Sequence, residues 1–317
     1  RQEADSVKND AEYIYTLSGN ELIIVAAWPA NALSESGRVT LPGHPHSLYL
    51  NDGKVVVLSQ LFDRREIMSP AMRAQHDARS GGGDHKGHDD GLLMGVAPDE
   101  LYDAYTPMTV LSLIDVHNPA SPTISHQQVF EGDMTGTRRI GSKVYLIQNH
   151  STLSRGLQTW PTVDWGASKA KKLAAMNAMV EANLEVIDAL TLEDFLPNRF
   201  TLNDEGLVIP EETIQIAACD RVFFPSAFSG RWLTTVITFD IKRPSLVDGT
   251  ALPGQWSTVY TSETGLYVAA DTQRMHWLWS EASAAPREVT TQIHKLGIST
   301  MTGRLDYEGS GVVAGRV

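Results

Sequence analysis

The sequence has a single cysteine, Cys219, among its 317 residues, so no disulfide can form within the chain. This scarcity is compatible with a reducing compartment and also with a secreted domain that is stable without cross-links. No stretch approaches the ~20 apolar residues that span a membrane as a helix. The chain opens at Arg1 with no signal peptide, which we interpret as the start of a processed protein or of a fragment.

Positive charge is also scarce. Lys and Arg number 26 against 38 Asp and Glu, which gives a net charge of −12 and a pI near 5.3. A field of this sign repels nucleic acid and anionic lipid, so neither is expected as a partner; its simplest role is solubility. A hydrophobic fraction of 42% indicates a chain with a real core.

Familiar catalytic signatures are missing as well. The sequence contains no Gly-x-Ser-x-Gly elbow, no His-Glu-x-x-His, no Walker loop and no dinucleotide fingerprint. No catalytic residue is assigned on this basis.

What the sequence does contain is a recurring strand unit. Residues 109–119 read TVLSLIDVHNP and residues 235–244 read TVITFDIKRP. Each is a run of β-branched, aliphatic or aromatic residues that ends in Asp, followed by an aliphatic residue, two polar residues and a proline, which is typical of a buried strand followed by a stop. Because Asp115 and Asp240 are equivalent, we expect both to accept N–H bonds from the turn after the strand. Recurrence in a β-rich chain predicts one sheet module used several times.

Hairpins account for much of the remaining chain. Gly19-Asn20, Asn51-Asp52-Gly53 and Gly141-Ser142 each separate two apolar runs, and these residues suit tight turns because they tolerate positive φ. Further strands are expected at 213–216, 257–260, 266–270 and 290–296, where His294 should lie on one face of its strand. Together these segments have the size of propeller blades.

Residues 165–196 differ from the rest and predict a helical insertion. Apolar residues recur there at helical spacing of three and four: Leu173, Met176, Val180, Leu184, Ile187 and Leu190. Residues 191–194 have the form of a capping box that opens a second short helical turn before Pro197. We expect the helix to pack on a sheet as a lid, with Leu173, Val180 and Leu184 buried; the other interpretation is a partner-binding helix.

Residues 63–99 interrupt the strand pattern and predict a long surface excursion outside the core. Five residues within 76–90 suit a borderline divalent cation such as zinc, copper or nickel: His76, Asp84, His85, His88 and Asp89. Against a metal site, Lys86 sits between two of the histidines, and Gly81–Gly83 gives no rigid support to the rings. Loose surface histidines also bind added metal without a biological role, so we expect no resident cofactor.

Two further features concern binding and reactivity. Trp160, Trp165, Trp277 and Trp279 lie near expected loops and suit either a sugar or peptide platform or packing between blades. Cys219 follows an apolar run and precedes Asp220, so we expect a buried and inert thiol whose neighbouring carboxylate disfavours the thiolate.

Segments spread over nearly the whole chain carry a family resemblance: 2–15 with 18–22, 218–225 (ACDRVFFP), 262–268 (SETGLYV) and 291–295 (TQIHK). They resemble secreted bacterial and archaeal proteins with a C-terminal β-propeller domain distantly related to WD-40 repeats. The resemblance implies a propeller scaffold and an extracytoplasmic location, and it carries no catalytic residues. The domain of that family continues beyond the point at which this chain stops, which implies a partial domain.

Taken together, these features predict an all-β, propeller-like single domain over 1–317, incomplete at about three to four blades, with the excursion at 63–99 and the helical insertion at 165–196. An incomplete ring predicts an open arc that self-associates through its edges or pairs with the remaining strands. The alternative is a small closed ring in which a strand around 13–17 pairs with residues 290–317.

Three functions are compatible with the sequence. The first is a secreted, non-enzymatic binding or scaffold module with a protein or carbohydrate ligand. The second is a metal-dependent hydrolase that uses the loop 76–90, and the third is a protein completed by more chain or by a partner subunit.

Overall fold

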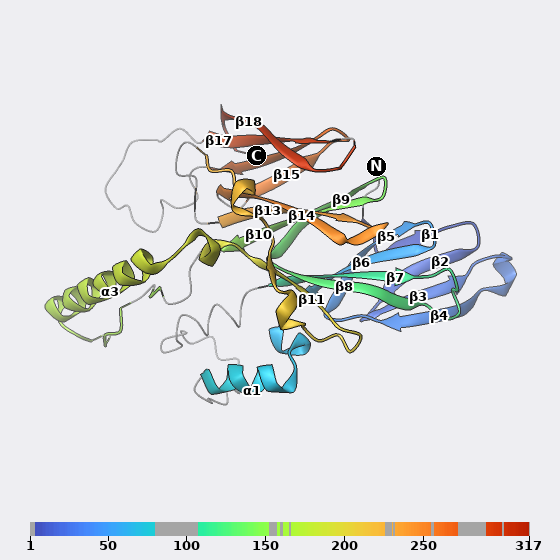
Figure 1. Ribbon diagram of the computed structural model, residues 1–317, viewed down its shortest axis with the longest axis horizontal. Coiled ribbons are helices and arrows are strands. Elements are labelled where there is room, and N and C mark those ends of the chain that lie inside the picture. Colours follow the sequence, from blue (N-terminus) through green and yellow to red (C-terminus); the bar gives the residue numbers. More distant parts are fainter. Residues whose placement is uncertain are drawn as a thin grey trace.

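The computed structural model describes residues 4–79, 107–151, 157–158, 161–164, 166–225, 230, 232–254, 257–271, 290–299 and 301–316. Their strands form four antiparallel sheets, one of six strands and three of four (Figure 1). The predicted all-β, blade-like architecture is therefore confirmed.

The sheets follow one another along the chain, with one exchange of strands. The first, in the order β1-β2-β3-β4, contains β1 (Val7–Asn9), β2 (Tyr13–Ser18), β3 (Glu21–Ala26) and β4 (Ser34–Thr40). The second, in the order β12-β11-β8-β7-β6-β5, contains β5 (His44–Asn51), β6 (Lys54–Leu61), β7 (Met108–Asp115), β8 (Thr123–Glu131), β11 (Asn198–Thr201) and β12 (Ile214–Gln215). The third, in the order β14-β13-β10-β9, contains β9 (Asp133–Ile140), β10 (Lys143–Ser151), β13 (Trp232–Asp240) and β14 (Arg243–Gly254). The fourth, in the order β15-β16-β17-β18, contains β15 (Ser257–Thr261), β16 (Gly265–Asp271), β17 (Thr290–Ile298) and β18 (Leu305–Ala314).

Helices are few in the described residues. They comprise α1 (Pro70–Arg79), α3 (Lys169–Ala189) and the 3-10 turns η1 (Ala30–Ala32), η2 (Arg64–Ile67), η3 (Leu192–Phe195), η4 (Pro210–Glu212) and η5 (Cys219–Arg221). None of those described is both long enough and apolar enough to cross a membrane. The capping box predicted at residues 191–194 is present at the start of η3.

The predicted hairpins form where the turn residues indicated. Gly19 and Gly141 have φ values of 59° and 61°, and Asp52 and Gly53 have φ values of 49° and 69°. These left-handed conformations are the ones that glycine and aspartate tolerate, so each turn closes the adjacent strands directly.

The recurring unit forms β7 and β13, each in the interior of its sheet. The carboxylate of Asp115 accepts a hydrogen bond from the His117 N–H at 3.0 Å, and that of Asp240 accepts one from the Lys242 N–H, also at 3.0 Å. The predicted turn role of both aspartates is confirmed.

Three apolar clusters join the four sheets in a row. One packs Tyr15 and Ile24 of the first sheet on Val57 of the second. The next packs Leu111 and Phe130 of the second sheet on residues of β10 and β13, and the third packs Ile147 on Leu266 and Leu296 of the fourth. No strand pairing in the described chain joins the first sheet to the fourth, since β2 pairs with β1 and β3 while β18 pairs with β17. The alternative in which residues 13–17 pair with 290–317 is therefore wrong.

The start of the predicted excursion belongs to the core, contrary to the sequence-based expectation. Ile67 is 1% exposed and Met68 is 7% exposed. Ile67 packs with Leu61, Met108 and Phe200 because the η2 turn directs it back over the ends of β6 and β7. Residues 80–99 of this segment lie outside the described chain.

The predicted burial of the α3 stripe is also wrong. Leu173, Val180 and Leu184 are 57%, 50% and 54% exposed, and α3 has no buried residue. The helix extends away from the sheets (Figure 1), so no sheet face lies against it. The less exposed residues form a neighbouring face that includes Met179, Asn183 and Val186; Asn183 exchanges two hydrogen bonds of 2.8 Å with the backbone of Gln158.

Candidate functional site at the loop-bearing ends of the sheets

The hairpin turns listed here and three long connections lie at opposite ends of the last three sheets. Turns at 52–53, 116–122, 141–142, 241–242, 262–264 and 299–304 join strands at one end, which we call the turn end. The segments 62–107, 152–231 and 272–289 all leave from the other end, which we call the loop end. Strand register places them together: Leu61 pairs with Met108, Ser151 with Trp232 and Asp271 with Thr291. These three long segments therefore emerge on one side.

Buried polar side chains gather at the loop end and connect three sheets. Gln148 of β10 donates through Nε2 to Thr109 Oγ1 of β7 at 2.8 Å and to the Gly132 carbonyl at 3.0 Å. Thr234 Oγ1 of β13 donates to Asn149 Oδ1 at 2.8 Å and lies 2.8 Å from Ser257 Oγ of β15. We call Thr109, Glu131, Gln148, Asn149, Thr234 and Ser257 the loop-end cluster.

Glu131 is the carboxylate of this cluster, and it ties two long segments to the second sheet. Its Oε1 accepts from Arg64 Nη2 at 2.6 Å, and its Oε2 accepts from the Asn198 N–H at 2.8 Å. The Glu131 side chain is 3% exposed, and the Arg64 guanidinium neutralises its buried negative charge. Arg64 also lies over the Phe200 ring at 5.2 Å, which fixes the start of the 62–107 segment beside β11.

Within the part of the chain that the structure describes, some polar atoms at this end have no hydrogen-bond partner. They include Gln148 Oε1, Asn149 Nδ2 and Thr235 Oγ1, all of them buried. An unpaired buried polar atom costs roughly 1–3 kcal/mol, so these atoms favour an incoming water or polar group. Neutral amides and hydroxyls of this kind can both donate and accept hydrogen bonds.

A small cavity of about 10 Å³ lies between the third and fourth sheets, lined by residues that include Thr234, Ser257, Gln292 and His294. This volume suits one water molecule, which needs two or more polar partners of the kind present. His294 lies on one face of β17, as predicted, with its Nδ1 3.1 Å from Tyr307 Oη. Burial lowers the pKa of His294, so the ring is neutral at physiological pH.

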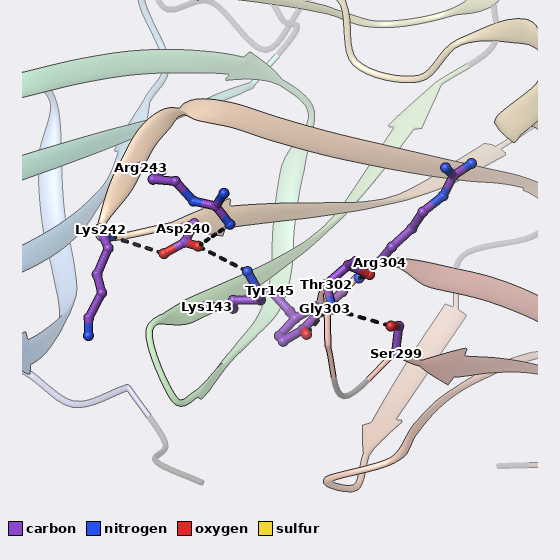
Figure 2. Close-up of polar contacts among 9 residues, drawn as sticks. All are labelled: Lys143, Tyr145, Asp240, Lys242, Arg243, Ser299, Thr302, Gly303 and Arg304. Atoms are coloured by element: carbon purple, nitrogen blue, oxygen red, sulfur yellow. Dashed lines mark hydrogen bonds and ion pairs between the residues drawn. The ribbon is translucent and has the colours of Figure 1, made fainter.

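The turn end is built differently, from ion pairs and backbone contacts (Figure 2). Lys143 Nζ lies 3.0 Å from Asp240 Oδ2, and Arg243 lies 3.5 Å from the same oxygen. Tyr145 Oη donates to the Gly303 carbonyl at 3.0 Å, which fastens the β17–β18 turn to β10. These contacts fix strand ends and short turns, so we assign the turn end a structural role.

The predicted metal ligands are not placed together by the described chain. The backbone of His76 lies in α1, and Asp84, His85, His88 and Asp89 lie outside the described residues. Trp160, Trp165, Trp277 and Trp279 lie outside them too. Where the structure describes the chain, no three His, Cys, Asp or Glu residues are grouped as a metal ion would require.

Cys219 is exposed, so its predicted burial is wrong. It lies at the start of η5, where its Sγ donates to Glu193 Oε1 at 3.3 Å. That hydrogen bond raises the pKa of the Cys219 thiol. A carboxylate does disfavour the thiolate, as predicted. The carboxylate with the larger effect, however, is that of Glu193, which is distant in sequence, and not that of Asp220.

Sequence reasoning missed the loop-end cluster, although a signal was present. The apolar runs of β10 and β13 end or begin in amide and hydroxyl residues, Gln148-Asn149 and Thr234-Thr235. Polar residues at the end of an otherwise apolar strand indicate where the apolar face of that strand stops. Only strand register could show that these ends meet.

The sequence was compared with known proteins. The sequence model of the beta propeller domain family matches residues 2–317. No curated protein matches the chain.

Proposed function

Because the chain belongs to the beta propeller domain family, we propose that it is a non-enzymatic binding or scaffold module whose ligand contacts the loop end of the sheets. The proposal rests on one observation: the long segments 62–107, 152–231 and 272–289 all leave the sheets at that end. Connecting segments carried by a rigid sheet scaffold are where binding residues concentrate, since their sequence varies without disturbing the core.

The loop-end cluster supports this role by holding the segments in place. Glu131 joins Arg64 from one long segment to Asn198 from another, and both contacts are buried or half-buried. Gln148, Thr109 and Thr234 then connect the sheets beneath them. Such a network holds binding residues in place before a ligand arrives, so less conformational entropy is lost on binding.

The chemistry of this end favours a neutral ligand rich in hydrogen-bonding groups, either a carbohydrate or a polypeptide. Its amides and hydroxyls donate and accept hydrogen bonds, and the Glu131 charge is already neutralised. The net charge of −12 disfavours nucleic acid.

We also propose an extracytoplasmic location, which rests on the resemblance to secreted proteins. Fractionation of cells that produce the protein would test it. Recovery from the medium, cell surface or periplasm is expected, and recovery from the cytoplasm would contradict the proposal.

Binding is tested with two matched variants of exposed apolar residues. Phe62, which is 60% exposed, follows β6 at the loop end, and Met301, which is 92% exposed, lies in the turn at 299–304. A panel of soluble oligosaccharides and peptides is titrated by calorimetry into the wild type, Phe62→Ala and Met301→Ala. At least one ligand should bind, with affinity reduced about tenfold by Phe62→Ala, the loss of ~1.4 kcal/mol that a contacting side chain supplies.

Met301→Ala should leave that affinity unchanged. Equal weakening by both variants, or weakening by Met301→Ala alone, would place the ligand elsewhere. Turnover of a panel member would instead favour the hydrolase.

A further inference from the structure

One segment contacts the second, third and fourth sheets on its way back from α3, and we call residues 196–225 the return segment. Its strand β11 extends the second sheet, where the Asn198 N–H donates to Glu131 of the loop-end cluster at 2.8 Å. The Phe223 N–H donates to a carbonyl of β14 in the third sheet at 2.9 Å. The Phe223 ring stacks on Tyr307 of the fourth sheet, with centroids 5.1 Å apart. The position of the return segment therefore depends on how these three sheets meet.

A histidine lies where the second and third sheets meet, beside the return segment. The His126 ring of β8 stacks on Phe239 of β13, with centroids 6.3 Å apart and an interplanar angle of 19°. Its Nε2 is buried and has no hydrogen-bond partner in the described chain. The charged groups that act on the ring are Glu212 and Arg199, which belong to the return segment and have opposite signs. Burial is the largest effect and lowers the pKa of His126, so the ring is neutral at pH 7.

A second histidine lies where the third and fourth sheets meet. His294 is 3% exposed and lines the small cavity beside Thr234 of β13. Its Nδ1 lies 3.1 Å from the hydroxyl of Tyr307, the residue on which Phe223 of the return segment stacks. The described residues that line the cavity come from β13 to β17 and carry no charge. Tyr307 is thus the titratable group that faces this ring, and no carboxylate lines the cavity.

Protonation places a positive charge at each of these two contacts between sheets. At His126 the attraction of Glu212 is opposed by the repulsion of Arg199, and Phe239 covers one face of the ring. At His294 the hydroxyl of Tyr307 is the polar partner, and a neutral hydroxyl compensates a buried charge poorly. Water stabilises an imidazolium far better than either contact does. Each protonated ring therefore favours an opening of the sheets at the place where the return segment crosses them.

We infer that His126 and His294 form an acid-operated switch, which releases the return segment from the sheets as pH falls below about 6.5 and so weakens ligand binding at the loop end. The effect on the ligand rests on the proposed function. It follows because the return segment is part of the long segment 152–231, and its release breaks the contact between Asn198 and Glu131.

The direction of the pH dependence follows from the burial of the two rings. A histidine whose pKa is lowered on folding stabilises the closed form fully above the pKa of an exposed ring, near 6.5. That stabilisation is lost as pH falls from there towards the lower pKa of the closed form. At pH 5.5, one unit below the exposed value, each histidine can shift the equilibrium towards the open form by up to about tenfold.

Hydrogen exchange of the full chain at pH 7.5 and 5.5 tests the switch, with each rate corrected for the intrinsic effect of pH. Residues 196–225 of the wild type should lose about tenfold or more in protection at pH 5.5, whereas β2 and β3, which contain no histidine, should keep theirs. The double variant His126→Gln with His294→Gln keeps a polar side chain that does not titrate and should lose this response. His117→Gln is the matched control, because the His117 side chain is 64% exposed at the turn end, and it should respond as the wild type does.

Three results would overturn the switch: a return segment equally protected at both pH values, a response that survives in the double variant, and an equal loss of protection in β2 and β3. The first and third need no variant to fold, and circular dichroism at pH 7.5 checks the folding of the double variant for the second.

Calorimetry at the same two pH values tests the coupling to the ligand. Affinity for the oligosaccharide or peptide that binds at pH 7.5 should fall about tenfold at pH 5.5 in the wild type and less in the double variant. An affinity that stays constant while the return segment opens would overturn the coupling. Failure of every panel member to bind at pH 7.5 would contradict the proposed function, whereas hydrogen exchange would still decide for or against the switch.

Discussion

The hydroxyl of Tyr145 on β10 donates a 3.0 Å hydrogen bond to the carbonyl of Gly303, in the turn between β17 and β18 (Figure 2). Both groups are buried, and burial raises the pKa of Tyr145 to about 12, so the hydroxyl remains a donor at physiological pH. The contact links the third sheet to the fourth at the turn end. It supplements the apolar cluster in which Tyr145 also packs.

Tyr145→Phe should lower the free energy of unfolding by about 1–3 kcal/mol, because the Gly303 carbonyl would remain buried without its donor. Urea denaturation followed by circular dichroism measures the change. Tyr260→Phe is the control, since Tyr260 is 59% exposed and its hydroxyl reaches water. Equal stability of the wild type and Tyr145→Phe would show that this bond contributes nothing to the joining of the sheets.

Asp240 provides a pH-dependent contact at the same end. Burial raises the pKa of its carboxyl, but hydrogen bonds from Lys143, the Lys242 N–H and Ser142 outweigh burial, so the pKa lies below its ordinary value. A carboxyl whose pKa is lowered on folding stabilises the fold above the pKa of the unfolded chain, near 3.9. That stabilisation is lost as pH falls through the folded pKa.

Asp240→Asn should therefore lower the free energy of unfolding by about 1–3 kcal/mol at pH 7, with the difference from wild type shrinking below about pH 4. Denaturation by urea at pH 7, 5, 4 and 3 measures it. Asp115→Asn is the comparison: the His117 N–H also lowers the pKa of Asp115, but its side chain is 40% exposed, so its loss should cost less and depend less on pH. A difference that stays constant over this pH range would exclude the carboxylate charge as the cause.

The histidines predicted as metal ligands lead to a separate prediction. Protein purified without a histidine tag should contain no stoichiometric zinc or copper, because Lys86 separates His85 from His88 and glycines precede them. Elemental analysis of the wild type and of the double variant His85→Ala with His88→Ala tests this. A full equivalent of metal, lost in the double variant, would favour the metal-dependent hydrolase over the binding module.

Strand content and turns could be predicted from the sequence because they depend on local residue patterns. The runs that form β7 and β13, and the turn aspartates Asp115 and Asp240, follow from residue type and position alone. Helical periodicity likewise predicted where α3 lies in the sequence, and the capping box of Thr191 and Asp194 predicted the start of η3.

The errors arose where long-range packing decides the outcome. Periodicity identified the apolar stripe of α3 but not what lies against it, so Leu184 was expected to be buried and is exposed. Ile67 was placed outside the core because residues 63–99 interrupt the strand pattern, whereas its neighbours in space are Leu61 and Phe200. The loop-end cluster depends on the register of three sheets, which no local pattern contains.

Glycines in two strands of the third sheet allow a last prediction about packing. A methyl group at Gly249 of β14 would collide with the carbonyl oxygen of Ile216, in the segment that returns from α3. Gly249→Ala should push this segment away and lower the free energy of unfolding by about 1–3 kcal/mol. Gly136 of β9 is the matched control, because a methyl group there would meet no atom within 4 Å beyond its own neighbours in the chain.

Gly136→Ala should be neutral or stabilise by up to ~1 kcal/mol, since alanine restricts the unfolded chain more than glycine does. Urea denaturation of both variants, with circular dichroism as the readout, gives the comparison. Equal stabilities for the two variants would mean that the backbone at Ile216 does not pack against β14.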